Sequence, residues 1–293
     1  MEKRNSKYRG LILGLCWVFV GACQLSEPEA DSLLATAPAP APVPSPVPDK
    51  PDSTLRLRLE VPDGYARIES GAFAAWLREL PLKEGRSEVK LHSGELKYNQ
   101  NVHWAVVDLD VGERDLQQCA DAVMRLRAEF LFDAGLHDDI AFNYTSGDRI
   151  PFSKWASGQK PVVSGNRVSW SSCSSCNSSK GSFRKYMDAI YMYAGTASLS
   201  KELDRKDLTD IEPGDVFIKG GFPGHAVIVV DVAENSNGNR VFAIAQSYMP
   251  AQSIHVLINP SDSELSPWYS VEQIENQLFT PEWTFDRDQL KSW

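Results

Sequence analysis

Residues 224–247 read GHAVIVVDVAENSNGNRVFAIAQS, and this stretch decides the fold. Residues 225–232 and 241–247 are apolar and β-prone, and the loop between them is rich in Asn, Gly and Ser. Two such runs around a short polar loop are typical of a β-hairpin. The stretch therefore predicts two neighbouring antiparallel strands at the centre of a sheet.

The register of this hairpin brings two polar side chains together. If Val232 pairs with Val241, then Gln246 pairs with Val227. Gln246 would then share a face with His225 and lie diagonally beside it, within side-chain reach. A register change of one residue would move Gln246 to the other face.

Regions around the hairpin predict both helices and strands. Apolar residues at helical spacing, with caps, predict helices over residues 70–80, 116–132 and 183–194. Short β-prone runs predict strands over residues 55–61, 88–92, 102–109, 139–145, 216–218 and 253–258. Residues 147–182 are polar and glycine-containing, so we expect a loop-rich segment there. Helices followed by an antiparallel sheet predict one α+β domain over residues 54–293.

The N-terminus has the pattern of an export signal. A basic stretch precedes an apolar run over residues 11–20, which is too short to span a bilayer as a stable helix. The run ends in Val20-Gly21-Ala22-Cys23, which resembles the lipobox of bacterial lipoproteins. The resemblance implies that residues 1–22 are a signal peptide and that Cys23 receives a lipid. The alternative is a plain secretory signal or short membrane anchor in which Cys23 has no role.

Residues 23–53 predict an extended tether. Alternating prolines with Ala and Val prevent helix and sheet pairing and favour a polyproline conformation. Such a linker would hold the domain away from a membrane bound through the Cys23 lipid. Gln24 follows the cysteine, and in Gram-negative bacteria that pattern implies an outer-membrane lipoprotein facing the periplasm.

The overall charge excludes one class of partner. The chain carries a formal net charge of −9, which argues against binding to nucleic acid or to anionic lipid. We expect no cofactor and no metal ion.

Three cysteines follow the lipid site. An exported protein meets an oxidising compartment, so we expect Cys173 and Cys176 to form a local disulfide. Unpaired thiols, a redox motif and a metal site are alternatives, although no second Cys or His pair lies nearby. Cys119 remains as the odd cysteine.

Cys119, His225 and Gln246 could serve as the nucleophile, the base and the orienting residue of a catalytic cysteine site. Cys119 lies near the start of a helix that we expect Asp115 to cap, where free N–H groups and the helix dipole lower a thiol's pKa. His225 would act as the base, and Gln246 would orient its ring. The Cys119 backbone N–H would bind the oxyanion, with Tyr98 or Gln117 as candidates for a second donor.

The order of these parts resembles the NlpC-type cell-wall cysteine peptidases and the related CHAP amidases. The matching features are Cys119 with its helix, the turn Pro213-Gly214-Asp215, Gly224-His225 and Gln246. The resemblance implies a papain-like core and a cysteine amidase or endopeptidase acting on peptidoglycan peptides. Two features differ: the nucleophile lies in Gln-Cys-Ala, and the long spacing to His225 implies an insertion around residues 140–182.

A second resemblance covers nearly the whole mature domain. Segments 115–127, 193–199 and 246–252 resemble a bacterial family labelled only as a domain of unknown function. That resemblance implies exported relatives and no known chemistry.

Two other functions remain open. One is a non-catalytic envelope-binding module on the same scaffold. The other is a metal-dependent hydrolase using Asp108 and Asp110, which share one face of a predicted strand, with His103 on the opposite face. A groove for sugars or peptides is a further possibility, for which the candidate aromatic residues are Trp104, Trp155 and Trp170.

Overall fold

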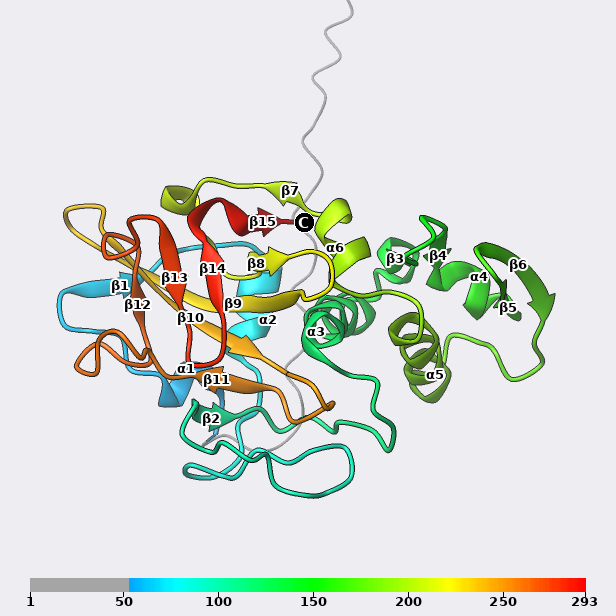
Figure 1. Ribbon diagram of the computed structural model, residues 1–293, viewed down its shortest axis with the longest axis horizontal. Coiled ribbons are helices and arrows are strands. Elements are labelled where there is room, and N and C mark those ends of the chain that lie inside the picture. The colour runs from blue at the N-terminus through cyan, green and yellow to red at the C-terminus, as the bar shows by residue number, and fades with distance from the viewer. Residues whose placement is uncertain (1–52) are drawn as a thin grey trace, which may run out of the picture. The chain divides into compact units, whose positions relative to one another are not determined.

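The computed structural model describes residues 53–293, and their centre is an antiparallel β-sheet (Figure 1). The predicted signal peptide, Cys23 and almost all of the predicted linker lie outside the described residues. The strand order is β2-β11-β10-β9-β8-β15-β7, with β1 paired to β9 and β12 paired to β10. The strands are β1 (Tyr65–Arg67), β2 (His103–Val106), β7 (Asp204–Arg205), β8 (Val216–Lys219), β9 (His225–Asn235), β10 (Arg240–Gln246), β11 (His255–Leu257), β12 (Tyr269–Ser270) and β15 (Leu290–Ser292).

The predicted hairpin forms the core of the sheet as β9 and β10. Its expected pairing of Val232 with Val241 is wrong, because Val241 pairs with Ala233. A bulge leaves Val230 without a partner on β10, and beyond it Ile244 pairs with Val229. The bulge shifts the register by one residue. The end of β10 that contains Gln246 therefore has the alignment that the sequence predicted.

Both faces of the sheet are buried, which explains the nearly continuous apolar run of β9. Ala226, Ile228 and Val230 join a core cluster on one face. Val227 and Val229 join a second cluster on the other face.

Helices cover the first face of the sheet. α3 contributes a buried stripe to that core cluster and contacts β9, and α2 also contacts β9. Outside residues 140–191, the helices are α1 (Leu55–Arg58), α2 (Ala72–Arg78), α3 (Cys119–Asp133) and α6 (Thr196–Glu202), with 3-10 turns η1 (His137–Asp139), η2 (Leu208–Asp210) and η3 (Arg287–Gln289). Among residues 53–293, no helix combines the length and apolar character needed to cross a bilayer.

The second face is covered by the C-terminal region, for which the sequence predicted no strand beyond residue 258. A two-stranded hairpin, β13 (Gln277–Phe279) and β14 (Thr284–Asp286), buries Leu278 and Phe285 in the second core cluster. Figure 1 shows β13 and β14 (red) lying over the strands of the main sheet.

Two predicted strands are corrected. Residues 55–61 begin with helix α1 because Leu55 and Leu59 are buried while Leu57 is exposed, which is helical spacing and not strand alternation. Residues 88–92 make only isolated bridges from Lys90 and Leu91.

Residues 140–191 form a lobe between α3 and α6, which we name the insertion, and Figure 1 shows it in green beside α3. The prediction that residues 147–182 are mainly loop is wrong, since β5 and β6, with six residues each, pair as a hairpin there. Its elements are β3 (Ala141–Asn143), β4 (Arg149–Pro151), α4 (Phe152–Ala156), β5 (Gln159–Ser164), β6 (Arg167–Ser172) and α5 (Lys180–Tyr191). α5 begins earlier than predicted because Ser179 caps it by accepting from the Ser182 N–H.

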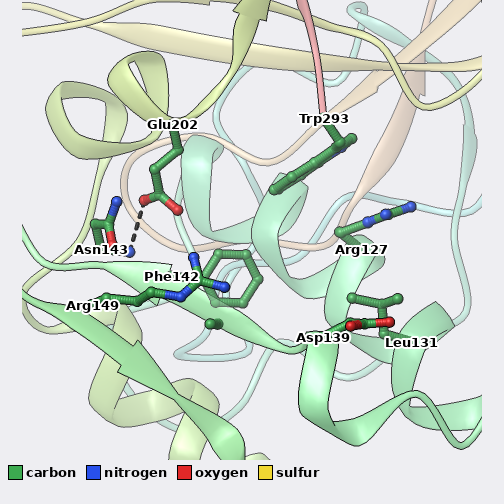
Figure 2. Close-up of a pocket in the computed structure, with 9 residues that line it drawn as sticks. Arg127, Leu131, Asp139, Phe142, Asn143, Arg149, Glu202 and Trp293 are labelled. Carbon is green, nitrogen blue, oxygen red and sulfur yellow. Dashed lines mark hydrogen bonds between the residues drawn. The ribbon is translucent and has the colours of Figure 1, made fainter. Parts of the chain in front are cut away.

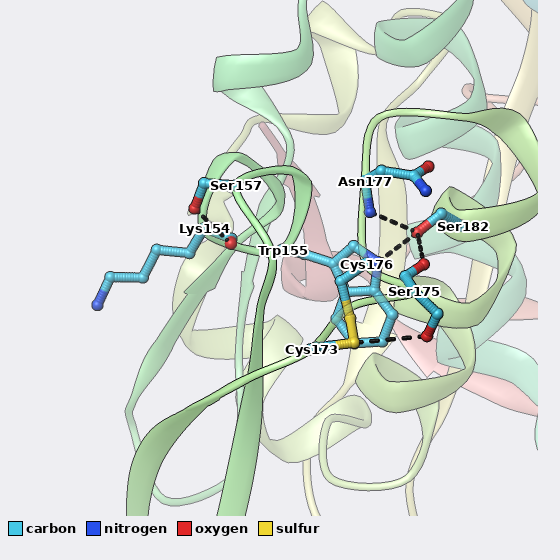
Figure 3. The surroundings of a disulfide bond; sticks show 8 residues. All are labelled: Lys154, Trp155, Ser157, Cys173, Ser175, Cys176, Asn177 and Ser182. Atoms are coloured by element: carbon cyan, nitrogen blue, oxygen red, sulfur yellow. Dashed lines mark hydrogen bonds between the residues drawn. A yellow bond between two sulfur atoms is a disulfide. The ribbon is translucent and has the colours of Figure 1, made fainter.

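The predicted disulfide between Cys173 and Cys176 is present in this lobe (Figure 3). It closes the turn between β6 and α5. Beside it, the Ser182 hydroxyl accepts hydrogen bonds from the Trp155 indole N–H at 2.9 Å and from the Asn177 backbone N–H at 2.9 Å. The bridge and this hydroxyl together fix the entry into α5.

Replacing Cys173 with serine is expected to lower the free energy of unfolding by about 2 kcal/mol, because the disulfide restricts the unfolded chain. The loss is at the low end for a disulfide because the closed loop is very short. Urea unfolding followed by circular dichroism measures the change. Reduction of the wild type should produce the same loss, and the reductant should not affect the variant. Equal stability of the oxidised and reduced wild type would contradict a stabilising role.

Candidate functional site

Cys119 occupies the first position of α3, directly after the cap residue Gln118. The Gln118 backbone N–H donates to the Asp121 carboxylate at 3.0 Å, which forms half of a capping box. The expected cap, Asp115, instead accepts from the backbone N–H of Ala251 at 2.7 Å. The helix therefore begins later than predicted, which leaves the Cys119 N–H without an intrahelical partner.

His225 is the first residue of β9, and its ring contacts the side chain at the end of β10. His225 Nε2 lies 2.8 Å from Gln246 Oε1, and both side chains are almost fully buried. The bulge in β9 shifts the register by one residue between the two ends of the hairpin, and this shift brings Gln246 beside His225.

Two observations place Cys119 beside this pair. The backbone N–H of Ala226, which directly follows His225, is within hydrogen-bonding reach of the Cys119 sulfur. The Tyr248 ring packs 4.8 Å from the His225 ring, and burial, followed by the nearby charges of Glu282 and Cys119, raises the pKa of Tyr248. The start of α3 and the adjoining ends of β9 and β10 therefore bring the three predicted residues to one place.

Aromatic side chains enclose the histidine. Besides Tyr248, the rings of Trp283 and Phe285 lie 5.3 and 5.8 Å from the His225 ring. Burial lowers the pKa of His225 to about 4, although its hydrogen bond to Gln246 acts in the opposite direction. The imidazole is therefore neutral at neutral pH.

The expectation of a lowered Cys119 pKa is wrong. The thiol is 7% exposed, and burial, followed by the nearby Asp121 carboxylate, raises its pKa to about 11. Nearby N–H groups lower the pKa, but by less than desolvation raises it. Cys119 and His225 therefore form a neutral thiol and imidazole in the resting protein.

The alkylation rate of Cys119 should reveal this neutral state. Only the thiolate reacts, so the rate with iodoacetamide is expected to rise about tenfold per pH unit from pH 6 to pH 9. Mass spectrometry of the Cys119 peptide measures the rate, and Cys119→Ala provides the blank. A rate that is already constant below pH 7 would indicate a thiolate–imidazolium pair and contradict the expectation.

The two candidates for the second oxyanion donor differ in position. The Tyr98 side chain is fully exposed. Gln117 is buried, with Oε1 accepting from the Arg125 guanidinium and with Nε2 lacking a partner. Gln117 thus retains a free buried donor two residues before Cys119, whereas Tyr98 makes no buried contact.

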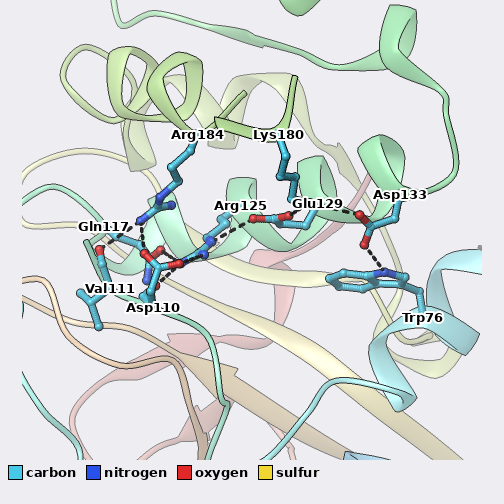
Figure 4. A network of polar contacts seen from close by, with 9 residues as sticks. All are labelled: Trp76, Asp110, Val111, Gln117, Arg125, Glu129, Asp133, Lys180 and Arg184. Atoms are coloured by element: carbon cyan, nitrogen blue, oxygen red, sulfur yellow. Dashed lines mark hydrogen bonds and ion pairs between the residues drawn. The ribbon is translucent and has the colours of Figure 1, made fainter. Parts of the chain in front are cut away.

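The acidic residues proposed for a metal site have other environments, and Figure 4 shows Asp110 beside Arg125 and Arg184. Asp110 accepts from Arg125 at 2.7 Å and from Arg184 at 3.1 Å, so guanidinium groups already satisfy its carboxylate. Asp108 is exposed, and His103 Nε2 lies 2.9 Å from the Ser87 carbonyl oxygen. Within residues 53–293, no three His, Cys, Asp or Glu side chains gather as a metal site would require.

The three tryptophans proposed for a groove come from two regions, since Trp155 lies on α4 and Trp170 on β6, whereas Trp104 lies on β2 of the main sheet. Arg58 covers the Trp104 ring, Lys154 covers the Trp170 ring, and Trp155 is buried in the insertion. The aromatic residues at the candidate site are Tyr248, Trp283 and Phe285, which the sequence analysis did not select.

A pocket of about 260 Å³ lies away from the candidate site (Figure 2). It is lined by Arg127 and Leu131 of α3, by residues of the insertion, by Glu202 and by Trp293. The lining contains two arginines, Arg127 and Arg149, and two carboxylates, Asp139 and Glu202. The lining therefore has no excess of one charge that would select a ligand.

The fold and the site define a class: an α+β domain with a buried cysteine, histidine and glutamine at one end of an antiparallel sheet. The chain belongs to the family described as domain of unknown function (4846), whose model matches residues 55–292. No curated protein matches the chain, and no solved structure matches it either.

Proposed function

We propose that this protein is a cysteine hydrolase of the cell envelope, an amidase or endopeptidase with a papain-like core of the NlpC type. Cys119 would be the nucleophile, His225 the base and Gln246 the residue that orients the base. The observation that carries the proposal is the 2.8 Å contact between His225 and Gln246 beside the Cys119 sulfur. A helix that begins with the cysteine and packs on an antiparallel sheet supports the papain-like core.

The neutral pair suits a reaction in which proton transfer accompanies attack. His225 Nδ1 takes the thiol proton as the Cys119 sulfur bonds to the substrate carbonyl carbon. The free Cys119 N–H at the helix start stabilises the oxyanion. Collapse breaks the C–N bond, and the leaving amine takes the proton from His225. Water then hydrolyses the thioester, with His225 as base, and the thiol is restored.

The proposed substrate follows from the proposed location. Export and lipid attachment at Cys23 would hold the domain at the envelope, on the outer membrane facing the periplasm in a Gram-negative cell. The proline-rich linker would let it reach the wall. Peptidoglycan peptides are the amide substrates that such a tethered hydrolase would meet.

A second function is favoured by one observation. The burial of Cys119, and the raised pKa that results, would equally suit a non-catalytic envelope-binding module that retains the scaffold. Such a module would bind wall fragments without releasing products.

Digestion of purified peptidoglycan separates the two functions. The wild-type protein should release new amino groups or carboxyl groups from the peptides, detected by mass spectrometry, and Cys119→Ala should release none. Binding without cleavage by both proteins would establish the module instead. Cleavage that survives Cys119→Ala but stops with a chelator would sink the cysteine mechanism.

A further inference from the structure

The Gln246 side chain uses all its hydrogen-bonding groups within the protein. Its Oε1 faces His225 Nε2 at 2.8 Å. Its Nε2 donates to Glu282 Oε2 at 2.8 Å and lies 3.3 Å from His255 Nε2. Gln246 is 1% exposed, so water cannot substitute for these partners.

The partners of the Gln246 nitrogen fix which way the amide points. A carboxylate only accepts hydrogen bonds, so the NH₂ group must face Glu282. His255 Nδ1 lies 2.8 Å from the Ser253 carbonyl oxygen and must donate to it. In the neutral His255 ring, Nε2 is then an acceptor for the second amide hydrogen. The Gln246 oxygen is left to accept from His225.

This orientation determines the tautomer of His225. An oxygen opposite His225 Nε2 requires the ring proton on that nitrogen, which leaves the Nδ1 lone pair free. We propose that Glu282 is a positioning residue that sets the His225 tautomer through Gln246. The inference rests on the proposed function, because a free Nδ1 is what accepts the thiol proton there.

Lys97 holds Glu282 in place. Lys97 Nζ lies 2.7 Å from Glu282 Oε1, and the two side chains are 8% and 15% exposed. The same ammonium lies 5.1 Å from the centroid of the Tyr248 ring, which packs on His225. Lys97 therefore supports the site through Glu282 and through Tyr248.

Glu282→Gln tests the proposal with little change in shape. Glutamine can donate as well as accept, so the Gln246 amide can turn and His225 can take either tautomer. We expect kcat/KM to fall about 10- to 100-fold, mainly in kcat. That loss is below the roughly 10⁴-fold fall that accompanies a wrong tautomer when the orienting residue itself is changed. Glu275→Gln, an exposed substitution in the same region, is the matched control.

A charge swap provides the rescue. In Glu282→Gln combined with Gln246→Glu, the new carboxylate accepts from His225 Nε2 and from the new amide. It also accepts from His255 Nε2, so His255 must then be protonated on both ring nitrogens. We expect this double variant to recover most of the lost activity, whereas Gln246→Glu alone places two carboxylates together and should not. Lys97→Met is a second variant, which removes the ion pair with Glu282 and leaves the Glu282 carboxylate in place. We expect it to lower kcat less than Glu282→Gln.

The decisive readout needs no substrate. ¹⁵N chemical shifts of the His225 ring should show one tautomer, protonated at Nε2, in the wild type and in Glu275→Gln. They should show a mixture in Glu282→Gln and one tautomer again in the swap. Unchanged shifts and unchanged kcat in Glu282→Gln would overturn the positioning role. A shift in tautomer in a protein that never cleaves wall fragments would uphold that role and reject the proposed function.

Discussion

Alanine at Cys119, at His225 or at both positions is expected to lower kcat/KM to one common floor, on the order of 10⁴-fold below the wild type. In the proposed mechanism the nucleophile and its base act as one unit, so removing either removes the whole covalent route. Their losses should therefore not multiply in the double variant. Steady-state hydrolysis of wall peptides by the three variants measures this.

The control for this experiment is another histidine. His137 lies in η1, beyond the opposite end of α3 from Cys119, so His137→Ala should keep kcat/KM near the wild-type value. Circular dichroism should show that all variants fold. A double variant far less active than either single variant would mean that Cys119 and His225 act independently.

Asp231→Ala is expected to lower the free energy of unfolding by about 3–5 kcal/mol, because it breaks a buried ionic network. Asp231 is fully buried and accepts from Arg67 at 2.6 Å and from Arg78 at 2.7 Å. Without the carboxylate, two guanidinium groups remain in a site from which water is largely excluded. Urea unfolding measures the change.

An exposed ion pair supplies the comparison for Asp231. Arg205 and Asp288 are 3.9 Å apart and largely exposed, so Asp288→Ala should cost less than about 1 kcal/mol. If Asp231→Ala lowered the free energy of unfolding no more than Asp288→Ala does, the buried network would contribute little to stability.

The sequence predicted the elements whose patterns are long. The apolar runs of β9 and β10, and the amphipathic stripe of α3, span enough residues to identify their structure. The strands of the C-terminal region were missed because each has only two or three residues. The β5–β6 hairpin was missed because it has few apolar residues, and one of them, Val162, is exposed.

The candidate site was predictable where its residues follow recognisable local patterns. Cys119 begins a helix and His225 begins a strand, and the hairpin brings Gln246 to His225. The sequence did not predict the roles of Glu282 and Lys97, because a contact between two loop residues far apart in the chain produces no local pattern. The bulge at Val230 was equally invisible, since an unpaired residue in an apolar run looks like its neighbours.

The burial of Cys119 also bears on how long the protein would last outside the cytoplasm. Thiolates attack peroxides and small disulfides, and these oxidants must reach the sulfur to be attacked. A covered thiol that stays protonated reacts slowly with both. If the protein is exported as proposed, this burial would keep the Cys119 sulfur reduced for longer in an oxidising compartment.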